Sequence, residues 1–342
     1  MWLRSSTREG FLRLLASILA LVSLCGCETL AYYAQAVGGQ VQLMARAQPV
    51  AALLADPATP APLRARLELA RSIREFSVRE LGLPDNGSYR SYAELGRPFA
   101  VWNVVAATEF SLEPVQSCFP VAGCVSYRGF FGREDAERHG AKLRAQGYDV
   151  YMYGVPAYST LGRFDDPLLS SFIRYADAEL ARLVFHELAH QLVYARGDTT
   201  FNESFAVVVE EEGVRRWLEF ENRSGELAAF RSAQARKREF AARVAGTRER
   251  LAAAYQESLP REAMLERKRV ELERLRAAYP GLPADINNAF LASIAVYTEL
   301  VPAFERLLAK EGSLDAFYER VKKLAKSGKR DIDDLLVRRP GT

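Results

Sequence analysis

The residues best suited to chemistry lie together in residues 186–190, which read HELAH. On a helix, side chains four positions apart point the same way, so both imidazoles can reach one metal ion. Glu187 follows the first histidine and faces the open side of that ion, where it can take a proton from water. Val184, Leu188 and Leu192 fall on the opposite face, so we expect them in the core.

A third ligand follows the histidine pair. Gly197 is predicted to end the first helix, and Glu203 lies near the start of a second. Two helices joined by a short turn pack antiparallel, which can bring Glu203 opposite His186 and His190. Two imidazoles, a carboxylate and an open position form the ligand set of a catalytic zinc. We therefore predict one zinc ion per chain at His186, His190 and Glu203, with Glu187 as the catalytic base. The alternative is two ordinary histidines on a buried helix, but the chain has only three histidines in all.

These motifs resemble those of the gluzincin peptidases. Residues 186–191 (HELAHQ) and 202–206 (NESFA) are similar to the paired motifs of the alanyl-aminopeptidase-like branch. In that branch another glutamate follows seven residues after the ligand and supports the ligand shell, and Glu210 holds that place here. The gap between His190 and Glu203 is shorter than in those enzymes. Their Gly-x-Met-Glu-Asn motif, which holds the substrate's free amine, has no match in this chain.

The chain more closely resembles a family of bacterial proteins described as predicted aminopeptidases, over nearly the whole mature length. The resemblance implies a zinc-dependent peptidase, aminopeptidase-like in its label, while endo- or exopeptidase action stays open. Besides the two metal motifs, the segments that carry it are residues 119–124 (FPVAGC), 157–162 (AYSTLG), 164–167 (FDDP) and 287–289 (NNA).

In such a mechanism Glu187 takes a proton from the attacking water and passes it to the leaving amine. The oxyanion then needs a donor besides the metal. Tyr297 is the leading candidate, because it follows the second metal motif on an apolar helix. Glu210 either supports a ligand histidine or belongs to a solvated acidic face. The other candidates for the oxyanion are Tyr153, Tyr158 and His139. The alternative is core packing for each tyrosine, Tyr297 included, and an exposed helix end for His139.

The N-terminus has the pattern of an export signal. Three arginines precede an apolar run over residues 14–24, which is too short for a good membrane span. The run ends at Gly26-Cys27, which resembles the bacterial lipoprotein signal. We predict that residues 1–26 are removed, that Cys27 is lipidated, and that the protein lies on the periplasmic face of a bacterial membrane, the outer one by our interpretation. The alternatives are a plain cleaved signal peptide and a short anchor helix.

Two cysteines remain in the mature chain, Cys118 and Cys124. An exported chain meets an oxidising compartment, so we predict a disulfide between them. The alternative is two buried free thiols.

The periodicity predicts an α+β fold that is mainly helical. Strands over 99–108, 125–131 and 148–154 should form a small central sheet, with a helix over 132–146 between the last two. We expect a single zincin-like domain over residues 27–342, in which 225–280 is an inserted helical hairpin, a charged arm. The remaining predicted helices cover residues 30–56, 62–81, 169–196 and 201–221, and a further apolar helical region begins at 285.

The net charge limits the classes of partner that the sequence favours. The formal net charge is +3, and three of the basic residues lie in the predicted leader, so nothing favours nucleic acid. A peptide substrate and, through Cys27, a membrane are the expected partners, and the sequence names no partner for the arm. The alternative function is a membrane-tethered binding or scaffolding lipoprotein with a structural metal site. Glu187 argues against it, because a structural site has no use for a base.

Overall fold

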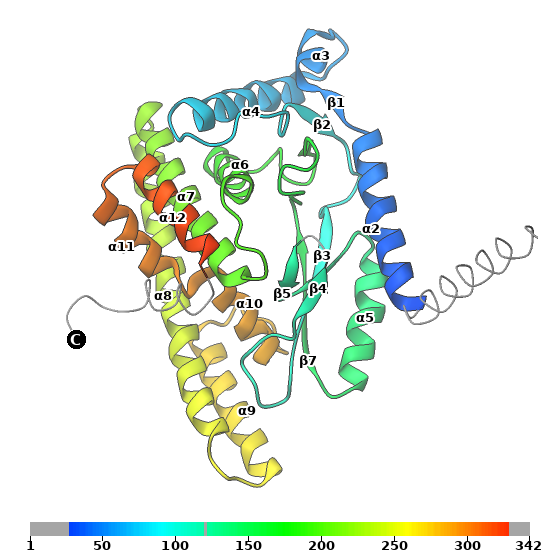
Figure 1. The fold of residues 1–342 in the computed structure, drawn as a ribbon, viewed down its shortest axis with the longest axis vertical. Helices are drawn as coiled ribbons and strands as arrows, with labels where there is room; N and C mark the ends of the chain where they lie inside the picture. The colour runs from blue at the N-terminus through cyan, green and yellow to red at the C-terminus, as the bar shows by residue number, and fades with distance from the viewer. Residues whose placement is uncertain (1–26, 120–121, 328–342) are drawn as a thin grey trace, which may run out of the picture.

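The computed structural model describes residues 27–119 and 122–327. The predicted signal peptide, residues 1–26, lies outside the described residues. The fold is α+β and mainly helical, as predicted, with a small sheet at its centre (Figure 1). In the part of the chain that the structure describes, no helix is both long and apolar enough to cross a membrane.

The central sheet has three antiparallel strands. Its middle strand, β3 (Val101–Ala107), pairs with β6 (Arg128–Phe130) on one side and with β7 (Asp149–Val155) on the other. Val104 and Ala106 point toward α5 (Arg133–Ala145), whereas Val105 and Ala107 point toward α10 (Asn288–Thr298). Because helices cover both faces, the middle strand is apolar apart from Asn103 and does not alternate between apolar and polar residues.

The two predicted metal-binding helices are α6 (Asp177–Leu192) and α7 (Thr199–Phe220). The first helix ends at Leu192 and not at Gly197 as predicted; Gly197, at a positive φ of 82°, instead allows the turn just before α7. The Asp198 side chain caps α7 by accepting a hydrogen bond from the Phe201 amide, as expected of an N-cap aspartate. Val184 and Leu188 are fully buried, which confirms that α6 has its core face opposite the histidines.

The N-terminal elements differ from the predicted ones. The helix predicted over 30–56 is two helices, α2 (Cys27–Ala45) and α3 (Val50–Ala55), separated by the short strand β1 (Gln48–Pro49). Pro49 has no amide hydrogen and restricts the residue before it to an extended conformation, which ends the first helix. The next helix, α4 (Ala61–Arg79), is close to its predicted bounds.

The helix predicted over 169–196 is also shorter than expected. Residues 168–169 instead form β8 (Leu168–Leu169), which pairs in parallel with β2 (Ser91–Ala93), and β2 pairs antiparallel with β1. Pairing with a strand far away in the sequence overrides the helical periodicity of these buried residues. The helix begins only at Asp177, where Asp177 and Glu179 place negative charge in its first turn.

The predicted helical hairpin consists of α8 (Ser224–Tyr255) and α9 (Arg261–Ala278), and it extends away from the rest of the molecule (Figure 1). It is not solvated all round, because Val244, Leu251 and Leu275 are buried with Phe290 and Leu291 of α10. The last helices, α11 (Val301–Glu311) and α12 (Leu314–Lys326), close the core against α7.

A short disulfide-bonded hairpin lies beside the central sheet. It consists of β4 (Ser117–Phe119) and β5 (Gly123–Val125), in which Cys118 pairs directly with Cys124. The two cysteines form the predicted disulfide.

Candidate metal centre and active site

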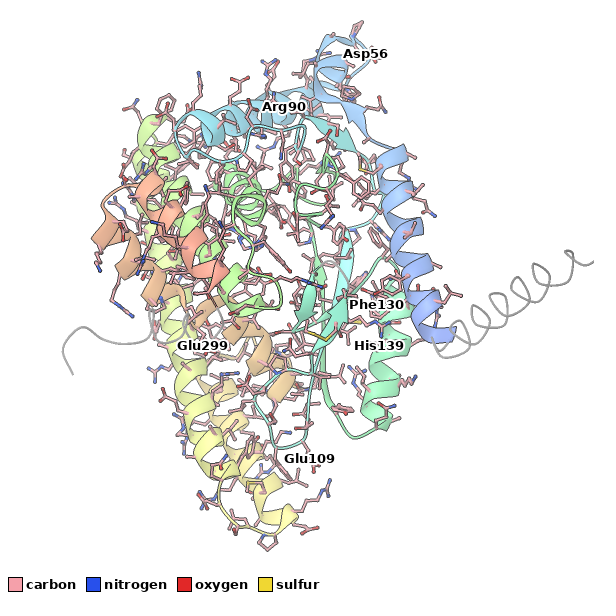
Figure 2. The ribbon with its side chains drawn as sticks, in the orientation of Figure 1. Asp56, Arg90, Glu109, Phe130, His139 and Glu299 are labelled. Atoms are coloured by element: carbon pink, nitrogen blue, oxygen red, sulfur yellow. A yellow bond between two sulfur atoms is a disulfide. The ribbon has the colours of Figure 1, made fainter. Side chains whose placement is uncertain are left out.

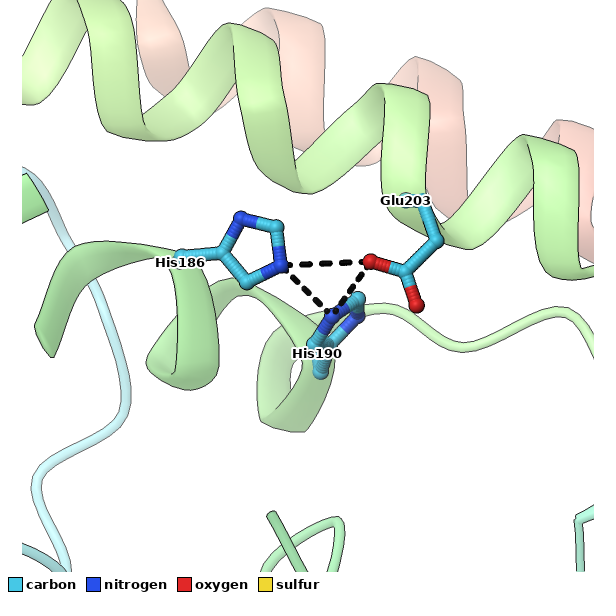
Figure 3. A group of neighbouring side chains, drawn as sticks. All are labelled: His186, His190 and Glu203. Atoms are coloured by element: carbon cyan, nitrogen blue, oxygen red, sulfur yellow. Dashed lines mark hydrogen bonds and ion pairs between the residues drawn. The ribbon is translucent and has the colours of Figure 1, made fainter. Parts of the chain in front are cut away.

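The structure brings the three predicted metal ligands together. His186 and His190 project from consecutive turns of α6, and Glu203 projects from the first turns of α7 (Figure 3). His186 Nε2 lies 3.2 Å from His190 Nε2 and 3.2 Å from Glu203 Oε2, and His190 Nε2 lies 3.5 Å from Glu203 Oε2. The three side chains therefore present three ligand atoms to one point.

These separations fit a tetrahedral metal ion. Two ligands bonded to zinc at about 2.1 Å in tetrahedral geometry lie about 3.4 Å apart. The three measured separations fall on either side of this value, as the edges of one face of a tetrahedron would. Among the described residues, this is the cluster of histidine and carboxylate ligands that could hold a metal ion. The fourth corner of the tetrahedron is not filled by these three side chains.

Glu210 fixes the orientation of the His186 ring. Its carboxylate lies 2.7 Å from His186 Nδ1, on the ring edge away from the other ligands. With Nδ1–H donated to Glu210, the Nε2 lone pair is free to bind a metal. Glu210 also accepts two hydrogen bonds from Arg182 Nη1, at 3.0 and 3.1 Å. Glu210 is therefore part of the site and not of a solvated acidic face, while Arg182 is a supporting residue that the sequence reasoning missed.

The charges around the ligands favour a cation at their centre. Burial lowers the pKa of His186, but Glu210 and Glu203 outweigh this effect and raise the pKa to about 10. Burial raises the pKa of Glu203, whereas His190 and His186 lower it to about 2. Without a metal, the site would thus hold a proton on His186 against an ionised Glu203. A divalent cation bound between the same groups would likewise compensate the negative charge of the Glu203 and Glu210 carboxylates.

Glu187 lies beside the ligands without being one of them. Its side chain lines a cavity of about 820 Å³ whose wall also includes His186, His190 and Glu203. Burial raises the pKa of the Glu187 carboxyl, and the neighbouring histidines lower it in part. An acid in this position can exchange protons with a molecule held in the cavity.

The turn between α6 and α7 is fixed by a residue of the second motif. Asn202 donates from Nδ2 to the Ala195 carbonyl at 2.9 Å and accepts from the Ala195 amide at 2.7 Å. This pair of hydrogen bonds closes the turn and places the next residue, Glu203, opposite the histidines. The role of Asn202 is therefore to position a ligand.

The disulfide-bonded hairpin packs on the same turn. Ala122 accepts hydrogen bonds from the Gly197 amide and the Tyr194 hydroxyl, both at 3.2 Å. A Cβ on Gly123 would lie 2.8 Å from the Gly197 nitrogen, so only glycine permits this close approach. Two segments distant in the sequence thus support each other beside the metal ligands.

Tyrosines surround the open side of the site. Tyr297 of α10 lines the cavity, and its ring centroid is 6.4 Å from that of His186. Tyr127 and Tyr194 line it too, although no sequence motif pointed to either. Burial raises the pKa of Tyr297 and Tyr127 well above the usual value. These hydroxyls therefore stay protonated at neutral pH and can donate hydrogen bonds.

The other oxyanion candidates are less well placed. Tyr158 lies at the rim of the cavity and is 38% exposed, and Tyr153 packs beside Asn103 without lining the cavity. His139 lies on α5, where its ring packs against Phe130 on the far side of the sheet from α10 (Figure 2). His139 as an oxyanion donor is therefore wrong, because β3 and its neighbours separate it from the site.

Comparison with known proteins gives one family. The model of the family described as "Putative aminopeptidase" matches residues 31–336, which is most of the chain and includes every residue of the site. No curated protein and no solved structure matches the chain.

Proposed function

The chain belongs to the family described as "Putative aminopeptidase", and from this membership and the site geometry we propose that it is a zinc-dependent peptidase. His186, His190 and Glu203 would hold one zinc ion, and Glu187 would act as the general base. The observation that carries the proposal is the ligand triangle with edges of 3.2, 3.2 and 3.5 Å, next to an acid that is not needed as a ligand. The paired motifs make the site gluzincin-like in our interpretation.

The chemistry divides between the ion and the protein. When bound, zinc lowers the pKa of water and polarises the carbonyl of the peptide bond. Glu187 takes the proton of the attacking water and later delivers it to the leaving amine. Burial raises the pKa of Glu187, which favours the protonated form that delivers the proton in the second step. Glu210 and Arg182 keep the His186 ring in place during the reaction.

A tyrosine completes the site. Tyr297 would donate a hydrogen bond to the oxyanion that forms at the attacked carbonyl, with Tyr127 as the second candidate. Both are half-buried, protonated and on the cavity wall that the triad shares. The cavity also favours catalysis over the alternative of a binding lipoprotein with a structural metal site, since it opens a path to Glu187 and the ligands.

The proposed location follows from the leader. Cys27 would carry lipid at the periplasmic face of a bacterial membrane, the outer membrane by our interpretation, so that the catalytic site acts on periplasmic peptides.

The proposal is tested by metal content and peptide hydrolysis. We expect one zinc per purified chain and hydrolysis of a mixed peptide library that a chelator abolishes and added zinc restores. His186→Ala should lose both zinc and activity, because two remaining ligands cannot retain the ion. The matched control is His139→Ala, which removes the chain's remaining histidine and should keep both. A metal-free wild-type protein, or hydrolysis that a chelator leaves unchanged, would refute the proposal.

A further inference from the structure

The cavity next to the metal ligands has the size of a substrate site. Its volume of about 820 Å³ lies within the range of ligand pockets, about 300–1,000 Å³. The metal triad and Glu187 form part of its wall. On another side it is bounded by α2, the first described helix, and by residues from the segment 157–164.

The walls away from the triad are mostly apolar. From α2 come Tyr32, Val37, Val41 and Met44, and Phe131, which packs against Gly39 of α2, belongs to the same wall. The apolar character continues at the mouth, where Val37 is 62% exposed and Val41 is 61% exposed. Apolar residues clustered around an open cavity indicate that its occupant brings apolar groups of its own.

Within the part of the chain that the structure describes, no acidic side chain remains in the cavity to bind an amine. Among the described residues that line it, the carboxylates are Glu187 and Glu203, and the proposed chemistry uses both. The other lining residue with a permanent charge is Arg163, which is basic and exposed. A free N-terminus is largely an ammonium near neutral pH, and burying it without a partner is costly. An aminopeptidase must hold this group within one residue of the bond that it cleaves.

A side chain suited to a peptide backbone does lie in the cavity wall. Gln40 of α2 lines the cavity, and both polar atoms of its carboxamide are buried without a hydrogen-bond partner among the described residues. An unsatisfied buried carboxamide is costly, and rotation of the flexible Gln40 side chain toward the cavity would let a ligand there satisfy both atoms. A peptide group offers one carbonyl and one N–H, which are the complements of the Gln40 nitrogen and oxygen.

We propose that the cavity binds an internal, apolar segment of a peptide chain, with Gln40 hydrogen-bonded to its backbone, so that the enzyme is an endopeptidase. This inference rests on the proposed peptidase function and narrows its substrate. Apolar side chains of the segment occupy the wall formed by α2 and Phe131. Neither chain end is required for binding, because the cavity offers no group reserved for an ammonium.

The first test compares free and blocked peptides. An octapeptide with Leu and Phe at its centre is offered with free ends, and again N-acetylated and C-amidated. We expect kcat/KM for the two to agree within about 3-fold, and mass spectrometry to show cleavage at an internal bond. A site built to bind the free amine would reject the blocked peptide by about 10⁴-fold.

The outcomes of this test distinguish the endopeptidase assignment from the proposed zinc-peptidase function. Release of single N-terminal residues from the free peptide alone would overturn the endopeptidase assignment and leave the zinc peptidase intact. Loss of cleavage on C-amidation would likewise overturn it, in favour of a carboxypeptidase. If neither peptide nor the mixed library is cleaved by zinc-loaded protein, both the proposed function and this inference fall. A Ser-substituted octapeptide that is cleaved as well as the Leu-Phe one would refute the apolar preference.

The second test addresses Gln40 itself. Gln40→Leu should lower kcat/KM for the blocked octapeptide by about 10-fold, the effect of losing hydrogen bonds to substrate. It should also weaken binding of that peptide to the zinc-loaded Glu187→Gln protein, measured by calorimetry. Gln42→Leu is the matched control, because Gln42 is exposed on the same helix and does not line the cavity.

A third variant keeps the side chain polar. Gln40→Glu places a carboxylate in the cavity and should make the free peptide the better substrate by about 10-fold. If Gln40→Leu and Gln40→Glu both behave as wild type, Gln40 does not contact the substrate and its assignment is wrong.

Discussion

His186 is fixed by contacts on both edges of its ring, so the candidate site depends on supporting residues as well as on its three proposed ligands. Glu203 faces Nε2, while Glu210 faces Nδ1 and is itself held by Arg182. The glutamate that a family resemblance placed at position 210 is therefore found in contact with the site. Arg182 was predictable in principle, because it lies one helical turn before His186 on the same face.

Replacing Glu210 should weaken the metal site. In Glu210→Gln the ring loses a charged acceptor, so we expect zinc affinity to fall by about 10- to 100-fold with the fold retained. Competition with a fluorescent chelator gives the affinity, and circular dichroism checks the fold. Glu212→Gln is the matched control, because Glu212 on the same helix pairs with Arg215 and Arg216 instead. An unchanged zinc affinity in Glu210→Gln would show that this contact does not support the ligand.

At the scale of elements, the site depends on the turn between α6 and α7, which two separate sets of contacts stabilise. Asn202 closes the turn between α6 and α7 from within, and the disulfide-bonded hairpin packs on it through Ala122 and Gly123. The hairpin also contributes Phe119 and Val125 to the cavity wall. Its disulfide therefore stabilises a part of the chain that shapes both the ligand turn and the cavity.

Removing the disulfide should lower stability. For a loop of this length, Cys118→Ser with Cys124→Ser should reduce the free energy of unfolding by about 2 kcal/mol. Urea denaturation measures the change. Wild-type protein treated with reductant should lose a similar amount, whereas the double variant should not respond to reductant. Equal stability of the oxidised wild type and the variant would contradict this role.

Elements whose bounds are set by local sequence signals could be predicted, whereas elements that form by pairing with distant parts of the chain could not. The metal ligands, the Asp198 cap and the strand run at 101–107 all follow from local periodicity and turn chemistry. The start of α6 did not follow, because β8 forms only by pairing with β2, far earlier in the chain. Tyr127 and Gln40 were missed for the same reason, since their place in the cavity depends on how separate elements pack.

At the scale of the whole molecule, the helix that follows the predicted anchor is also a wall of the cavity. The helix α2 begins at Cys27 and is held on the sheet by Gln35, whose Oε1 accepts a hydrogen bond from the Phe131 amide. Tyr32 packs between Phe130 and Phe119. A helix of 19 residues is about 29 Å long, so a lipid on Cys27 would keep the cavity close to the membrane surface.

The anchor is a testable part of this arrangement. We expect mature protein to begin at Cys27 carrying acyl chains, because stable anchoring requires more than one chain or signal. We also expect Glu28 at the next position not to retain it at the inner membrane. Mass spectrometry of the N-terminal peptide and membrane fractionation give the answer, with Cys27→Ser as the unanchored control. A mature N-terminus at any other residue, or one without lipid, would rule out this location.

The most direct test of the account as a whole is the Glu187→Gln variant, assayed for zinc content and peptide hydrolysis together. Glutamine has nearly the same size and still accepts a hydrogen bond, but it cannot take a proton from water. Because His186, His190 and Glu203 would hold the ion without Glu187, the variant should retain one zinc per chain. Its activity should fall by at least about 10²- to 10⁴-fold, the contribution of a positioned general base. In parallel, Glu203→Gln should lose zinc affinity, since a neutral amide replaces an anionic ligand. A Glu187→Gln protein that holds zinc and remains fully active would contradict the mechanism.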